Sequence, residues 1–169
     1  MGMSGPCGNG TSHKMSGTQD AENRAIVEAF LRSQNTMTLS TCDESGWPQA
    51  TPLFYIVDED MRLYWVSSLS SAHSHQLARE PRAAVSIYRP TDDWKKICGV
   101  QMRGDVTRVV PKQKRKTITD VYCSRFNLGI FFRPIISRSA LFYFIPSWIR
   151  YIDNERQFGY KFELILSGT

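Results

Sequence analysis

A short polar segment of the chain places three hydroxyl groups near one imidazole. The four residues are Ser67, Ser68, Ser71 and His73. Residues 70–80 have the length of a short helix that Pro81 stops, so Ser71 lies near the helix start. The free N–H groups of a helix start favour a bound anion such as a phosphate group. The alternative is that these serines only cap the helix and form a polar loop.

The cysteines and histidines form no recognisable metal or catalytic motif. The four cysteines are Cys7, Cys42, Cys98 and Cys123, and no pair has C-x-x-C spacing. The three histidines do not combine with them as zinc ligands, so we expect no metal site. Free, buried thiols in a reducing compartment are the simplest interpretation. A dinucleotide or phosphate-loop glycine motif and a Ser-His-Asp set are also absent.

The charge balance is basic, with a net charge of +5 and a pI of about 9.1. This balance favours anionic ligands. The densest basic cluster, Lys112, Lys114, Arg115 and Lys116, is typical of the solvated face of a helix, so nucleic-acid binding is a third and weaker hypothesis. No apolar run reaches the roughly 20 residues of a membrane span. We expect a cytoplasmic protein without membrane contact.

Hydrophobic spacing divides the chain into a tail and one folded domain. Residues 1–17 are rich in Gly, Ser and Asn and predict a disordered tail, which leaves residues 18–169 as a single domain. Residues 20–34 predict a helix, because Ile26, Val27, Phe30 and Leu31 fall on one face. This pattern is typical of a helix that covers the open end of a barrel.

The hydrophobic period then changes to two, which predicts strands. Strands are expected at 36–41, 49–57 and 63–67, with a turn at 43–46 in which Gly46 takes positive φ. Two tight connections in succession predict an antiparallel meander. Further strands are expected at 83–88, 97–110, 140–152 and 158–165, with bulges or bends at Gly99 and Gly104 and a helix at 111–127. Six to seven antiparallel strands with short connecting helices describe a small barrel.

Four short motifs follow one another in the first two thirds of the chain. They read GWPQATP at 46–52, LYWVSS with SAH at 63–68 and 71–73, QLAREPRAAV at 76–85, and GVQMRGD at 99–105. Together they resemble the FMN-binding split-barrel family around pyridoxamine 5′-phosphate oxidase, over roughly residues 20–110. Residues 149–154 and 158–159 resemble the tail of an uncharacterised bacterial subgroup of the same barrel.

The resemblance implies a mainly β (α+β) antiparallel split β-barrel that holds FMN at a homodimer interface. It implies that the flavin phosphate lies near His73 and the serines, and that the ring rests on the second strand. The implied cofactor contacts are Gln49, Ala50, Thr51, Ser67, Ser68, Ser71, His73 and Gln101, with Trp148 and Arg150 supplied by the partner subunit. The alternative for Gln101 is a polar barrel residue that faces water, and for Trp148 a core or interface residue.

The phosphate motif departs from the family pattern at two positions. Where the family often has Arg and Lys after the serine, this chain has Ala72 and His73. A permanent charge is thereby replaced by one that titrates, so phosphate affinity is expected to depend on pH.

The resulting functional hypothesis is an FMN-dependent oxidoreductase of unknown substrate. It is not expected to be pyridoxamine 5′-phosphate oxidase itself, because the C-terminal part lacks that enzyme's Arg-x-His type of ending. The alternative is a non-catalytic protein that binds flavin, deazaflavin or haem on the same barrel, with His73 or His75 as a haem ligand.

Overall fold

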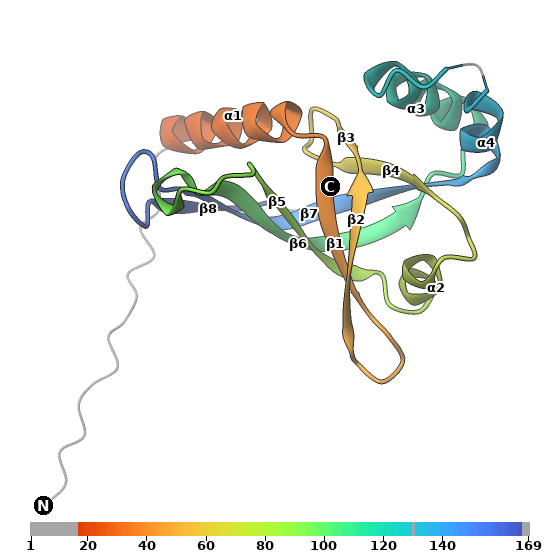
Figure 1. Ribbon diagram of the computed structural model, residues 1–169, viewed down its shortest axis with the longest axis horizontal. Coiled ribbons are helices and arrows are strands. Elements are labelled where there is room, and N and C mark those ends of the chain that lie inside the picture. Colours follow the sequence, from red (N-terminus) through yellow and green to blue (C-terminus); the bar gives the residue numbers. More distant parts are fainter. Residues whose placement is uncertain (1–16, 130, 167–169) are drawn as a thin grey trace, which may run out of the picture.

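The structure is a computed structural model that describes residues 17–129 and 131–166. Within these residues the chain forms eight strands, four α-helices and one 3-10 helix (Figure 1). The strands are β1 (Thr36–Cys42), β2 (Pro48–Phe54), β3 (Ile56–Val57), β4 (Leu63–Ser67), β5 (Arg82–Tyr88), β6 (Cys98–Arg108), β7 (Ala140–Asp153) and β8 (Lys161–Ile165). The helices are α1 (Gly17–Ser33), α2 (Ala72–Arg79), η1 (Trp94–Lys96), α3 (Lys112–Arg125) and α4 (Arg133–Arg138). Apart from Gly17, which begins α1, the predicted tail lies outside the described residues.

The strands form one curled antiparallel sheet in the order β2-β1-β5-β6-β7-β4-β3. Strand β7 is the longest, and it pairs with β4 near its start, with β8 near its end and with β6 along most of its length. This arrangement confirms the predicted antiparallel split barrel with short connecting helices. The strand count exceeds the expected number because residues 49–57 form two strands, separated at Tyr55.

The barrel is split between β2 and β4. Strands β2 and β3 lie at opposite ends of the sheet order although Tyr55 alone separates them in sequence, so the sheet must curl to bring its ends together. β2 and β4 approach each other there, but the ladders of the described residues pair β2 with β1, and β4 with β3 and β7. Both predicted antiparallel hairpins are therefore confirmed, but the expected single strand at 49–57 is wrong, because it is broken between the two pairings. Pro48 and Pro52 lack an N–H group, which is typical of an edge strand such as β2.

The core follows the predicted alternation. Met37, Leu39 and Thr41 of β1 are buried. Across the sheet, Leu39 lies beside Val85, which lies beside Met102, and all three belong to the main core cluster. Helix α1 covers this core with Val27, Phe30 and Leu31, the face expected from the sequence, and it contacts β3 and β8.

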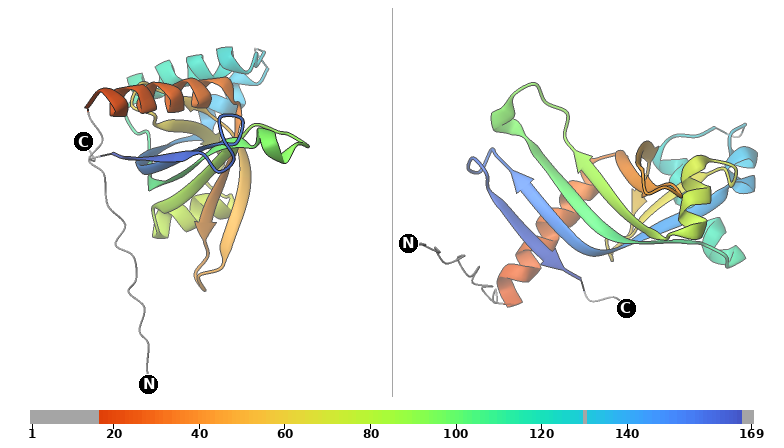
Figure 2. Two further views of the ribbon diagram at one scale, coloured as in Figure 1. Left: turned by 90° about the vertical axis from the view of Figure 1, so that its left-hand side faces the viewer. Right: turned by 90° about the horizontal axis from the view of Figure 1, so that it is seen from below.

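The opposite face of the sheet carries polar and charged side chains. A row of register partners runs from Pro52 through Thr38, Ser86, Gln101 and Arg150 to Glu163, crossing six strands. In the right-hand view of Figure 2, β5 to β8 lie in front of α1, so this helix covers the other face. We call this surface, opposite the main core, the outer sheet face.

Glycines permit a turn and a close strand crossing. Gly46 has a φ of 86° in the β1–β2 turn, which confirms its predicted conformation. The β6–β7 register shifts between Arg103 and Gly104, so Gly104 lies at a bulge as predicted. Gly99 instead stands in regular register with Tyr88 and Ile152. A Cβ atom on Gly104 would lie 2.0 Å from the carbonyl oxygen of Ile145, so β7 leaves no room for one.

The sequence predicts one of the two later helices and not the other. Helix α3 lies within the range expected from Pro111 onward. The short helix α4 differs from the expectation, because it has only six residues and no side-chain cap, and Pro134 near its start is its main local signal. No helix in the described part of the chain is long and apolar enough to cross a membrane.

The contact at Gly104 yields a stability test. We expect Gly104→Ala to lower the free energy of unfolding by roughly 1–3 kcal/mol, because the new methyl group must displace the β7 backbone. Gly129→Ala is the matched control, since a Cβ there meets nothing within 4 Å. Urea denaturation measures both, and equal midpoints for the two variants would contradict the close crossing.

Candidate functional site

The junction between β4 and α2 is built by a network of serine hydrogen bonds. Ser71 is the N-cap of α2, with extended backbone angles, and its hydroxyl accepts a bond from the Ser74 N–H. The hydroxyls of Ser71 and Ser74 both donate to the Ser68 carbonyl, at 2.9 and 2.8 Å. The Ser68 hydroxyl itself is exposed and lies 2.7 Å from that of Ser70. This network fixes the loop that precedes the helix.

His73 turns back from the first turn of α2 onto these serines. Its Nε2 atom lies 2.6 Å from Ser67 Oγ and 3.1 Å from Ser71 Oγ. The sequence thus predicted a group of residues that the fold does bring together, and we call Ser67, Ser71 and His73 the serine–histidine cluster. Burial lowers the pKa of His73 below its ordinary value of 6.5, so the ring is mostly neutral at pH 7. The expected titrating cation therefore appears only in acid or beside a bound anion.

The edge strand β2 is tied to α2 by a buried amide. Gln76 Nε2 donates to Gln49 Oε1 at 2.7 Å, and the Thr41 hydroxyl donates to Gln76 Oε1 at 2.5 Å. Gln49 and Thr51 alternate with Ala50, so they point to the inner side of β2 and Ala50 points to the outer sheet face. Gln49 thus lies beside α2.

A second group of the predicted residues lies on the outer sheet face. Gln101 and Arg150 are register partners on β6 and β7. The Trp148 indole N–H donates to Glu163 Oε2 at 3.0 Å, and Arg150 forms an ion pair with the same carboxylate at 2.7 Å. These bonds lower the pKa of Glu163, so its carboxylate stays ionised at neutral pH.

Arg103 completes this group. Its guanidinium lies 4.4 Å from the Trp148 ring centroid, and that of Arg150 lies 5.0 Å from it, so two cations contact one indole. Arg103 and Glu163 are not among the residues predicted from the sequence. The available signal was the alternation of side chains along β6 and β8. However, the strand register decides which residues of these strands lie next to Trp148. We call Arg103, Trp148, Arg150 and Glu163 the tryptophan cluster.

The two groups are separate within one chain. No hydrogen bond or ion pair recorded for the described residues joins the serine–histidine cluster to the tryptophan cluster. One lies at the β4–α2 junction and the other on the outer sheet face. Within the described part of one chain, the two groups are therefore not in direct polar contact.

A cavity of about 510 Å³ lies beside α2 on another face of that helix. Its lining includes the apolar side chains of Leu69, Leu77, Val106 and Phe142, together with His75 and Arg108. His75 is exposed, unlike His73, because residues two apart on a helix do not share a face.

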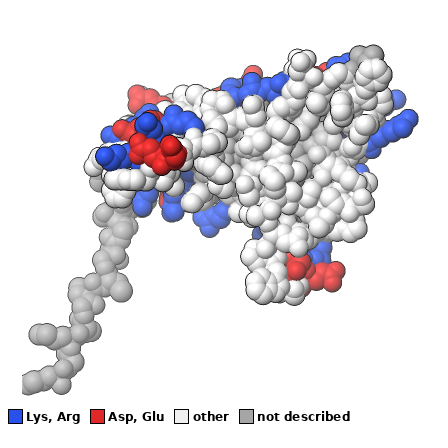
Figure 3. Space-filling view, viewed as in Figure 1, with Lys and Arg blue, Asp and Glu red and all other residues white. Residues whose placement is uncertain are grey.

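On the face seen in Figure 3, the basic residues do not form one continuous patch. Figure 3 shows Lys and Arg scattered along the rim and near both ends of one face, mixed with acidic side chains. On α3, Lys114 lies over the rings of Tyr64 and Tyr143, whereas Lys112, Arg115 and Lys116 line a cleft with Arg133. Asp120 also lines this cleft and pairs with Arg133, so the cleft is not purely basic.

Comparison with known proteins gives a family match over most of the chain. The family model described as pyridoxamine 5′-phosphate oxidase matches residues 24–153. The UPF0306 protein plu4501 of Photorhabdus laumondii is 28% identical over 142 residues, which are 83% of this chain and 94% of that protein.

Solved structures share the fold at lower identity. A conserved hypothetical protein, Rv2991 of Mycobacterium tuberculosis, has a TM-score of 0.69 at 18% identity and covers 89% of this chain and 92% of its own. HutZ, described as the haem storage protein of Vibrio cholerae, has a TM-score of 0.62 at 14% identity and covers 72% and 88%. A FAD-binding protein of Mesorhizobium loti has a TM-score of 0.57 at 16% identity and covers 74% and 88%. At these identities the likeness shows the fold alone.

The burial of His73 has a measurable consequence for stability. Because the folded-state pKa of His73 is lowered, the unfolded chain binds the proton more readily, and stability is lost as the pH falls from 6.5 through the folded pKa. We expect His73→Asn to flatten this loss between pH 7.5 and 5, as measured by urea denaturation. The control is His75→Asn on the exposed face of α2, which should keep the wild-type pH dependence. Identical pH dependence in both variants would contradict the assignment.

Proposed function

The chain belongs to the pyridoxamine 5′-phosphate oxidase family, and from this premise we propose that it binds FMN and acts as a flavin-dependent oxidoreductase. The single observation that carries the proposal is the serine–histidine cluster at the start of α2. The cluster gathers hydroxyls, an imidazole and helix N–H groups, which are suitable donors for a phosphate monoester. The substrate is proposed to differ from that of the oxidase that gives the family its name, because Ala72 and His73 replace the usual cations.

Each predicted residue has a role in this proposal. Ser67, Ser68 and Ser71 would donate to the flavin phosphate, and His73 would take up a proton beside it. The flavin ring would rest against β2, where Gln49, Ala50 and Thr51 present main-chain groups on a strand edge without a ladder partner among the described residues. When bound, FMN supplies the redox chemistry itself, and the protein's part is to orient the ring and tune its surroundings.

A homodimer would complete the site. Gln101, Trp148 and Arg150 lie on the outer sheet face, apart from the serine–histidine cluster of the same chain. A second copy that packs against this face could bring its Trp148 and Arg150 to the flavin of the first. The aromatic and arginine content of the tryptophan cluster is typical of interface centres.

A second candidate function is haem binding without turnover. The observation in its favour is the cavity beside α2, where apolar walls meet His75 and Arg108. An exposed imidazole can ligate haem iron, and an arginine can pair with a propionate. A deazaflavin is a further alternative ligand for the flavin slot, since it has the same flat ring shape.

The compartment is proposed to be the cytoplasm. The three cysteines in the described residues, Cys42, Cys98 and Cys123, are free thiols, which is usual in a reducing environment.

The flavin proposal is tested by titration with FMN. We expect flavin absorption bands in the purified or reconstituted protein, and Ser71→Ala should weaken FMN binding about 10-fold or more through loss of a bond to the charged phosphate. Ser70→Ala is the control, because Ser70 bonds only the exposed Ser68 among the recorded partners. Failure of the wild-type protein to bind FMN at micromolar concentration would overturn the proposal.

The pH dependence of the same titration separates His73 from the serines. A bound dianion raises the pKa of His73, so binding takes up a proton and affinity should rise as the pH falls from 8 to about 6.5. His73→Ala should remove this rise.

Sedimentation equilibrium measures whether the protein is a dimer. Tight FMN binding by a monomer would contradict the shared site.

The haem hypothesis predicts that His75, and not His73, contacts the ligand. Under this hypothesis added haemin gives a Soret band that shifts or weakens in His75→Ala and stays unchanged in His73→Ala. An unchanged Soret band in His75→Ala would exclude the α2 cavity as the haem site.

A further inference from the structure

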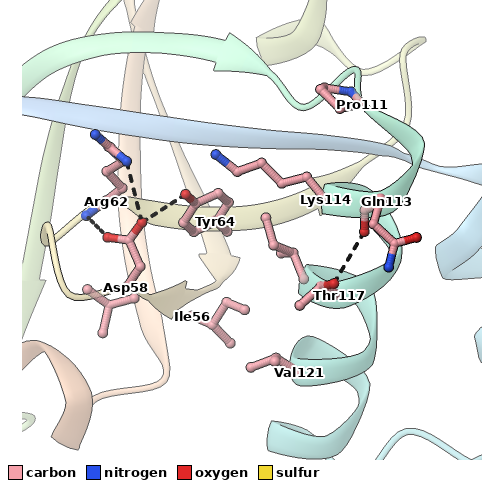
Figure 4. A pocket seen from close by; sticks show the side chains of 11 residues that line it. Ile56, Asp58, Arg62, Tyr64, Pro111, Gln113, Lys114, Thr117 and Val121 are labelled. Atoms are coloured by element: carbon pink, nitrogen blue, oxygen red, sulfur yellow. Dashed lines mark hydrogen bonds and ion pairs between the residues drawn. The ribbon is translucent and has the colours of Figure 1, made fainter. Parts of the chain in front are cut away.

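A second cavity, of about 650 Å³, lies between the β3–β4 hairpin and helix α3. This volume falls within the range of small-molecule sites, roughly 300–1,000 Å³. Figure 4 shows residues of the hairpin on one side and of α3 on the other. The cavity is distinct from the serine–histidine cluster, because Tyr64 and Ser67 are three residues apart on β4 and point to opposite faces.

The walls of this cavity are largely apolar. They comprise Ile56 and Val57 of β3, Ile118 and Val121 of α3, and Pro111 before that helix. Ile56 and Ile118 also pack on the small core cluster of Tyr64, Val109 and Leu141, so this wall is continuous with buried structure. Val121, by contrast, is 52% exposed, which leaves apolar surface facing the opening. Apolar walls of this kind gain free energy when an apolar ligand covers them.

Lys114 brings a positive charge to this apolar surface. Its ammonium group lies 5.2 Å from the ring centroid of Tyr143 and 5.9 Å from that of Tyr64, and the two rings stack at 5.4 Å. In Figure 4 the side chain reaches from α3 toward Tyr64. The ion pairs recorded for the described residues give Lys114 no carboxylate partner. Two aromatic faces thus position a cation without neutralising it.

The carboxylate in the cavity wall is already fully engaged. Asp58 accepts the Tyr64 hydroxyl at 2.8 Å and backbone N–H groups of Asp60 and Arg62 at 3.0 and 2.9 Å. Arg62 lies 4.0 Å from Asp58 and 3.0 Å from Asp60. Burial, and the bond to Asp58, raise the pKa of Tyr64, so its hydroxyl remains a donor to Asp58. Among the residues that line the cavity, Asp58 and Arg62 carry opposite charges, and Arg62 also pairs with Asp60 outside the lining, so Lys114 is the lining cation that holds no carboxylate in these ion pairs.

We propose that this cavity binds a monoanionic organic acid with an apolar body, whose carboxylate pairs with Lys114 and whose body covers the wall formed by Ile56, Ile118 and Val121. A single cation beside apolar walls matches one negative charge and an alkyl or aryl body better than it matches a phosphate dianion. The binding is independent of FMN.

Octanoate and 1-octanol are suitable probes, because they share a chain length and differ in charge. We expect saturable octanoate binding in calorimetry or ligand-observed NMR, with and without FMN. Lys114→Gln should weaken octanoate binding about three- to fivefold, the upper part of the range for an exposed ion pair, and should change octanol binding less than about twofold.

Two further variants define the outcome. Lys116→Gln removes an equal charge from α3 in a neighbouring cleft, and octanoate binding should be retained. Val121→Asp places a carboxylate on the exposed apolar wall and should weaken both probes. The proposal is overturned if wild-type protein shows no saturable octanoate binding, or if Lys114→Gln and Lys116→Gln weaken octanoate binding equally. Circular dichroism establishes that each variant is folded.

Discussion

Tyr55 holds the two ends of the curled sheet in place where no strand ladder between described residues joins them. Its N–H donates to the Asn35 carbonyl at 3.1 Å, and its buried hydroxyl donates to the Leu31 carbonyl at 2.7 Å. Both acceptors lie where α1 ends and β1 begins, so one residue fixes the β2–β3 joint against the helix that covers the core. A buried acceptor without its donor costs about 1–3 kcal/mol, which makes this joint specific. With the joint fixed, β2 approaches β4 without pairing, and its free edge remains open beside α2.

Local pattern was sufficient for most elements of this fold, and contacts between strands explain what it missed. Strand β4 has the predicted bounds, and α1 buries the predicted face, because both depend on residues a few positions apart. The division of residues 49–57 at Tyr55 was not visible, since a tyrosine is a good strand residue and its partners lie in α1 and the following loop. The same difference between local pattern and strand contacts explains which candidate residues could be predicted to lie together. The serines and His73 are close in sequence, and the fold does place them together, whereas Arg103, Trp148 and Glu163 meet only through the register of β6, β7 and β8.

The tryptophan cluster is hard to explain as a device for stabilising a single chain. Cation–π contacts at exposed sites contribute only about 0.5–1 kcal/mol each, and exposed ion pairs contribute little more. Yet Arg103, Arg150 and Glu163 hold the Trp148 ring from three strands in a defined orientation. Such contacts strengthen to about 2 kcal/mol or more when water is excluded from them. We infer that the cluster contributes most of its stabilising free energy when a second surface or a flat ligand covers the outer sheet face.

His73, in place of a permanent cation, changes the charge and the stability of the serine–histidine cluster. A lysine at this buried position would need a counter-anion, because an unpaired charge loses its hydration there at a cost of several kcal/mol. His73 avoids this cost, since burial lowers its pKa and the neutral ring is satisfied by Ser67 and Ser71. The neutral cluster is therefore stable by itself, and under the proposed function a bound dianion would have to offset only the protonation of the ring. Under the same proposal, His73 would give weaker phosphate binding at alkaline pH than a permanent positive charge at this position.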